Sequence, residues 1–175
     1  MNWLKRLIHR LFRRKKRQEA IVTLEKANEI FLPQVVELLH EVSTVTLPLK
    51  GRSMRPFLED GRDKALLKLA DTPKVGDAVL AEIKKGHFVL HRIIRIDGEA
   101  VTLRGDGNLK VEYCRIGDIH AKAIAFFRKG NDKPDSTDGM KWRIYSWWWT
   151  RLFPIRRYLL FLLYPHIPES IKKRR

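Results

Sequence analysis

The chain has 175 residues, of which 44% are hydrophobic and 32% charged, and its formal net charge is +16. This length can bury one core, and the hydrophobic share excludes a chain that is disordered throughout. With Cys114 as its one cysteine, the chain cannot form an intramolecular disulfide, and no spacing of cysteines predicts a metal site. We expect one domain with appendages, and neither a metal nor a cofactor.

The excess positive charge lies at the two ends of the chain. Residues 1–17 hold eight Lys or Arg and no acidic residue, and residues 141–175 hold nine Lys or Arg and a single acidic residue. The stretch between them, 18–140, holds 19 basic and 19 acidic residues and is therefore neutral. The excess charge that would attract an anionic partner therefore lies at the two ends.

Residues 1–17 form a basic arm in which pairs of apolar residues alternate with pairs of cations. A repeat of four places the apolar residues on one helical face and the cations on the other. This pattern is typical of a helix in a membrane interface, here with Trp3, Leu7 and Leu11 contacting anionic lipid. The alternative is an amphipathic helix that packs on its own domain.

Residues 18–42 predict a helical lead-in, in which Pro33 marks a break or a restart. From there to residue 130 the pattern becomes that of a β domain, with short apolar strands separated by turns such as Asp97-Gly98. A run of short strands predicts a coiled β-sheet or a β-barrel-like domain. The strand candidates are 44–47, 64–69, 78–83, 87–96, 100–104 and 119–127.

Residues 131–141 are polar and predict a linker, and 142–175 form a tail rich in aromatic residues and arginine. No apolar run approaches the ~20 residues of a membrane-spanning helix. The mixture instead predicts a helical segment in a membrane interface, with Trp147, Trp148 and Trp149 contacting lipid. The alternative is that these aromatics pack on the β domain or mediate dimerisation, so the oligomeric state stays open.

Both ends combine cations with apolar faces, which favours an anionic membrane surface over nucleic acid as the partner. The basic flanks favour the cytoplasmic face of a bacterial inner membrane, with the protein attached peripherally and no spanning helix.

Three short segments of the β domain carry the residue types of a serine hydrolase. Ser53 lies in Gly51-Arg52-Ser53-Met54-Arg55-Pro56, His91 ends an apolar run, and Asp106 lies in Gly105-Asp106-Gly107-Asn108. They supply a nucleophile, a general base, and a carboxylate that orients the base.

These segments resemble a known family. Gly-x-Ser-Met-x-Pro is similar to the serine box of the superfamily that joins type I signal peptidases to the self-cleaving SOS and phage repressors. The pair His91-Arg92 and the Gly-Asp-x-Asn box resemble the signal peptidase branch found in the endoplasmic reticulum, archaea and sporulating bacteria. The resemblance covers about 47–127 and implies a coiled β peptidase domain with these supporting residues: Gly51, Met54, Pro56, Arg92, Gly105 and Asn108.

The chain departs from that pattern at the acidic residue. Some members of the branch carry a further aspartate shortly after Gly-Asp-x-Asn, where this chain has Glu112 and, further on, Asp118. Asp106 is our first assignment for the carboxylate that orients His91, and Glu112 stays open as the alternative. Membrane signal peptidases also have a spanning helix and act on the face opposite to the cytoplasm.

Together these observations predict a serine endopeptidase that cleaves a peptide or protein at a membrane surface through an acyl-enzyme on Ser53, with His91 as general base. The resemblance implies processing of signal peptides. Two alternatives stay open: a self-cleaving protein of the repressor kind, and a non-catalytic module that binds membrane or nucleic acid.

Overall fold

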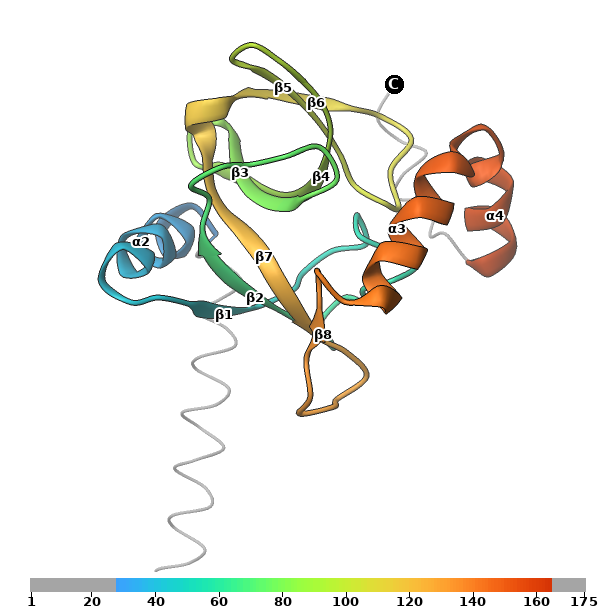
Figure 1. Ribbon diagram of the computed structural model, residues 1–175, viewed down its shortest axis with the longest axis horizontal. Helices are drawn as coiled ribbons and strands as arrows, with labels where there is room; N and C mark the ends of the chain where they lie inside the picture. Colours follow the sequence, from blue (N-terminus) through green and yellow to red (C-terminus); the bar gives the residue numbers. More distant parts are fainter. Residues whose placement is uncertain (1–27, 165–175) are drawn as a thin grey trace, which may run out of the picture.

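The computed structural model describes residues 28–164, which form a strongly curved sheet with helices at its two ends (Figure 1). The basic arm with Trp3, Leu7 and Leu11 lies outside the described residues, as does the end of the tail. The elements in chain order are α2 (Asn28–Glu41), β1 (Val45–Pro48), β2 (Lys64–Leu69), β3 (Ala78–Lys84), β4 (His87–Asp97), β5 (Ala100–Arg104), β6 (Glu112–Arg115), the 3₁₀ turn η1 (Ile116–Asp118), β7 (Ile119–Phe127), β8 (Asp135–Ser136), α3 (Met140–Arg151), the 3₁₀ turn η2 (Phe153–Ile155) and α4 (Arg156–Leu163).

The sheet has eight antiparallel strands in the order β1-β2-β7-β3-β4-β5-β6, with β8 pairing to β7. Register shifts interrupt the pairs β2–β7, β3–β4, β3–β7 and β4–β5. Irregularities of this kind bend strands and increase their twist, which allows the sheet to coil as Figure 1 shows. The sheet is not closed into a barrel. The expectation of a mainly β domain is confirmed.

The expected strand boundaries agree with the structure where the apolar pattern is strong. β2, β5 and β7 have the expected ends, and β1, β3 and β4 differ from expectation by a single residue at one or both ends. β6 and β8 were not expected, because β6 has only four residues with a charged residue at each end, and β8 has two residues in a polar stretch. The other strands could be predicted because buried and exposed side chains alternate along them. In β2, for example, Ala65 and Leu67 are fully buried between exposed or half-buried neighbours.

Residues 131–141, expected as a linker, are instead attached to the β domain. They contain β8 and the first residues of α3, and the carboxylate of Asp135 accepts hydrogen bonds from Arg128 and Lys141 at 3.1 and 2.7 Å. The strand pairing with β7 and these charge-assisted bonds fix where α3 begins.

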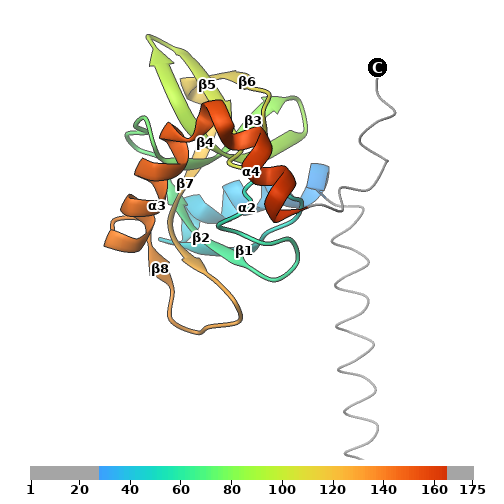
Figure 2. The same ribbon diagram turned by 90° about the vertical axis from the view of Figure 1, so that its right-hand side faces the viewer.

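Helix α3 packs one face against the sheet and exposes the other (Figure 2). Trp142 and Trp149 are buried, whereas Trp147 and Trp148 are 49% and 56% exposed. The expectation that Trp149 contacts a membrane is therefore wrong. Its position seven residues after Trp142 places both rings on the packed face of the helix.

Two apolar clusters form the core of the β domain. One lies among α2, β1, β2 and β7 and includes Phe57 and Trp142, and the other lies among β3, β4 and β5 around Val79, Ile93 and Leu103. The cleft described below opens where these two clusters meet the loop between β1 and β2. Between residues 28 and 164, none of the helices combines the length and apolar character needed to cross a bilayer.

Candidate active site

The serine loop, residues 49–63 between β1 and β2, carries Ser53 and is fastened at several points. Gly51 has a φ of +87°, a conformation that side chains beyond glycine rarely adopt. Its N–H donates to Asp60 Oδ1 at 2.9 Å. The buried carboxylate of Asp63 accepts the N–H groups of Glu59 and Lys129 at 2.9 and 3.0 Å. These bonds hold Ser53, which is half-buried, in a fixed turn.

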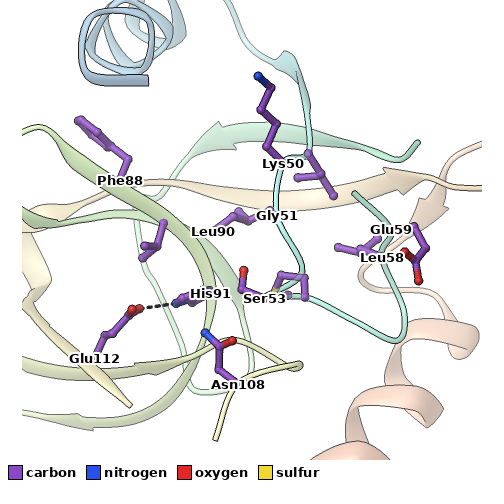
Figure 3. A pocket seen from close by; sticks show the side chains of 13 residues that line it. Lys50, Gly51, Ser53, Leu58, Glu59, Phe88, Leu90, His91, Asn108 and Glu112 are labelled. Atoms are coloured by element: carbon purple, nitrogen blue, oxygen red, sulfur yellow. Dashed lines mark ion pairs between the residues drawn. The ribbon is translucent and has the colours of Figure 1, made fainter. Parts of the chain in front are cut away.

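Ser53 and His91 line the same cleft, a cavity of about 280 Å³. Its walls contain apolar and polar side chains in about equal share and come from the serine loop, the first half of β4 and the start of β6 (Figure 3). Met54 and Asn108, both expected as supporting residues, also line it. The remaining lining residues are Leu49, Lys50, Gly51, Leu58, Glu59, Phe88, Val89, Leu90 and Glu112.

His91 lies in β4 with only 2% of its surface exposed. Its Nδ1 is 2.5 Å from Oε2 of Glu112, and in the part of the chain that the structure describes neither of these two buried atoms has another polar partner. Ser53 and Glu112 lie on opposite sides of the imidazole ring (Figure 3). Burial lowers the pKa of His91 below its ordinary value of 6.5, and Glu112 partly opposes this shift. His91 is therefore neutral at neutral pH, as a general base must be.

Gly105 lies where the serine loop and His91 meet. An added Cβ there would lie 3.0 Å from Nε2 of His91 and would collide with the carbonyl oxygen of Ser53. The Nε2 edge of the ring therefore faces the serine loop while the Nδ1 edge faces Glu112. A glycine is required at this position because the backbone, the base and the serine loop approach each other so closely.

Asp106 does not orient His91, which corrects our first assignment. Its Oδ1 accepts from Arg92 Nε at 2.9 Å, and its Oδ2 accepts from Arg92 Nη2 at 2.7 Å and from the Tyr145 hydroxyl at 2.9 Å. Both oxygens are thus engaged elsewhere. Consecutive residues of a strand point to opposite faces, so a carboxylate that binds Arg92 lies on the face away from His91. Glu112, the open alternative, is the residue that contacts the base.

Asp106 instead belongs to the aspartate loop, residues 105–108, which holds the serine loop in place. The N–H of Gly107 donates to the carbonyl oxygen of Ser53 at 2.7 Å, and the N–H of Asn108 donates to Gly105 at 3.0 Å. The supporting residues expected from the sequence are therefore brought together: Gly51 and Pro56 in the serine loop, Arg92 beneath Asp106, and Gly105 and Asn108 beside the base.

Two further residues that bind Asp106, Tyr145 and Trp149, were not expected at the site. They come from α3, about forty positions further along the chain, and only the helical spacing of the aromatics could have indicated that they share a packed face.

The cleft thus combines a fastened serine, a buried neutral histidine and a carboxylate on the far side of that histidine, which are the parts needed for acyl transfer. Neither the models of known protein families nor the curated proteins give a match to this chain.

Proposed function

We propose that this protein is a serine endopeptidase of the signal peptidase kind that cleaves a peptide or protein at a membrane surface. The observation that carries the proposal is the placement of Ser53 and Glu112 on opposite sides of the buried ring of His91, within one cleft. The coiled antiparallel sheet is of the kind that the sequence resemblance implies, and it supports the same reading. The test is digestion of a mixed peptide library by the wild type and by Ser53→Ala, read by mass spectrometry.

In the proposed mechanism, Nε2 of His91 accepts the proton of the Ser53 hydroxyl while Oγ attacks the substrate carbonyl carbon. The carboxylate of Glu112 accepts a hydrogen bond from Nδ1–H of His91 and stabilises the imidazolium that forms. The imidazolium then protonates the leaving amine, so the peptide bond breaks and an acyl ester on Ser53 remains. A water molecule, deprotonated by the same histidine, hydrolyses the ester. Backbone N–H groups of the serine loop are the nearest donors for the oxyanion.

The edge of β4 that lines the cleft favours an extended peptide as the substrate. β4 pairs with β5 only from Arg92 onward, so within residues 28–164 its first residues are paired with β3 alone. Phe88, Val89 and Leu90 of this half line the cleft. An extended peptide can add to such an edge through backbone hydrogen bonds, with alternate side chains entering the cleft. This arrangement would bring a substrate carbonyl to Ser53.

The pH dependence of cleavage is expected to report the lowered pKa of His91. Because only the neutral ring accepts a proton, kcat/KM should fall on the acid side with a midpoint below 6.5. Folding stability should fall in the same direction, because below pH 6.5 the unfolded chain binds a proton that the folded protein resists. The measurements are pH profiles of kcat/KM and of Tm, with His120→Gln as the control. An acid midpoint above 6.5 would contradict the assignment.

Helices α3 and α4 and the turn between them support the membrane part of the proposal. Residues 140–164 contain no acidic residue, and Arg143, Arg151 and Arg157 are exposed. Large apolar side chains are exposed on the same elements, which suits an anionic membrane surface better than water. They are Ile144, Trp147, Trp148, Phe153, Ile155, Tyr158, Phe161, Leu162 and Leu163.

Replacing Trp147 and Trp148 with serine is expected to weaken binding to vesicles that contain phosphatidylglycerol by at least about tenfold, because burying one large apolar side chain contributes about 1.5–3 kcal/mol. Tyr113→Ser is the control, since Tyr113 is even more exposed than either tryptophan but lies on β6. Vesicle sedimentation measures the effect. Binding that is unchanged in the double variant, or equal on vesicles of phosphatidylcholine alone, would contradict a role for this surface.

A further inference from the structure

Helix α3 forms hydrogen bonds with the aspartate loop from outside the β domain. The hydroxyl of Tyr145 donates to Oδ2 of Asp106 at 2.9 Å, and Nε1 of Trp149 donates to the main-chain carbonyl of the same residue at 2.8 Å. A third bond joins Arg92 Nη1 to the Ser146 hydroxyl at 2.8 Å. Side chain and backbone of Asp106 are thus both bound by one face of α3, on which positions 145 and 149 are one turn apart.

The helix that makes these bonds is itself held firmly. The ring of Trp142 packs 4.9 Å from the rings of both Phe57 and Phe126. At the other end, the buried guanidinium of Arg156 donates to the carbonyl of Trp149 at 2.7 Å. Aromatic packing at one end and a charge-assisted bond at the other leave α3 little freedom to shift relative to the sheet.

Through Asp106, α3 is connected to the reacting groups. The residue before Asp106 is Gly105, which packs against Nε2 of His91, and the residue after it is Gly107, which binds the carbonyl of Ser53. A displacement of Asp106 would therefore move the serine loop relative to the base. Burial and the neighbouring Asp106 raise the pKa of Tyr145 well above 10, so its hydroxyl remains a hydrogen-bond donor across the working pH range.

We propose that Tyr145 and Trp149 are positioning residues, which set the distance between Ser53 and His91 by fixing the aspartate loop from α3. This inference rests on the proposed function, because the position of the aspartate loop affects catalysis only if Ser53 and His91 react together. It extends the catalytic unit beyond the β domain, so that the site is complete only with the C-terminal helix in place.

The test uses the full chain with Tyr145→Phe and Trp149→Phe, which keep an aromatic ring and remove the donor. Each is expected to lower kcat about tenfold with KM changed by less than about twofold, because misplacement of reacting groups acts on the chemical step. Tyr113→Phe is the matched control, since it removes the hydroxyl of an exposed tyrosine on β6 that forms no part of the cleft or the membrane surface. This control should not change kcat.

A second readout does not depend on cleavage. In ¹⁵N NMR titrations of the imidazole of His91, Tyr145→Phe and Trp149→Phe should shift its pKa upward toward 6.5, because a loosened loop admits water to the ring. If the wild type shows no Ser53-dependent cleavage, the proposed function fails, and the titration still decides whether α3 is coupled to the base. A lower Tm with kcat and the His91 titration unchanged would show a role in stability alone and overturn the inference.

Discussion

Replacing Ser53 with alanine is expected to lower kcat for peptide cleavage by on the order of 10⁶-fold, the loss that follows when a serine nucleophile is removed from a triad. The physical reason is that no acyl-enzyme can form without Oγ, while the rest of the cleft stays intact. Binding of peptide should therefore survive. The measurement is digestion of a mixed peptide library, with products identified by mass spectrometry.

The matched control for this variant is Ser43→Ala, which removes an exposed hydroxyl in the same chain. It should cleave as the wild type does. Products that persist in Ser53→Ala would contradict the assignment of the nucleophile. Ser53-dependent products that come only from the protein's own chain would favour self-cleavage of the repressor kind over cleavage of a separate substrate.

Separate substitution of Glu112 and Asp106 is expected to have different main effects, on catalysis for Glu112 and on folding stability for Asp106. Glu112→Gln should lower kcat by about 10³- to 10⁴-fold, because an amide no longer fixes the tautomer of His91 or stabilises its charged form. Its Tm should change little, because the Glu112 side chain is 32% exposed. Removing the charge that raises the pKa of His91 should also move the acid limb of the pH profile to still lower pH.

Asp106→Asn should act strongly on folding, and through the aspartate loop it should lower kcat by about tenfold, far less than Glu112→Gln does. The variant leaves the guanidinium of Arg92, 1% exposed, without its counter-charge, and breaking a buried ion pair costs about 3–5 kcal/mol. A loss of this size corresponds to a fall in Tm of roughly 10 °C. Calorimetry and kcat measured on the same two preparations separate the effects. A large loss of Tm in Glu112→Gln together with a normal Tm in Asp106→Asn would reverse the two roles.

The fold was accessible from the sequence where apolar residues alternate strongly. β2, β5 and β7 each place small or branched apolar residues on one face, and their ends agree with expectation. β6 was not accessible, because it has only four residues and charged residues, Glu112 and Arg115, stand at both its ends. The order of strands in the sheet depends on contacts distant in sequence, which no local pattern encodes.

At the site, the sequence motifs predicted the correct three segments but the wrong carboxylate as the partner of His91. Asp106 was chosen because it lies in the glycine-rich box, whereas Glu112 becomes the partner of His91 only when β6 folds beside β5. The alternation of His91 and Arg92 across β4 could have separated the two roles, because each points to a different face. For Trp149, composition indicated an interface, but only the packing of α3 shows which aromatics face the sheet.

The most direct test of the central claim is to trap the acyl-enzyme. Wild-type protein mixed with a peptide that it cleaves is quenched in acid within the first turnover, digested, and searched by mass spectrometry for a peptide that carries the acyl group. We predict an added mass equal to that of the N-terminal product less one water molecule on the fragment that contains Ser53, and none in His91→Ala. An adduct on Cys114, or cleavage with no adduct on Ser53 under any quench time, would contradict the account.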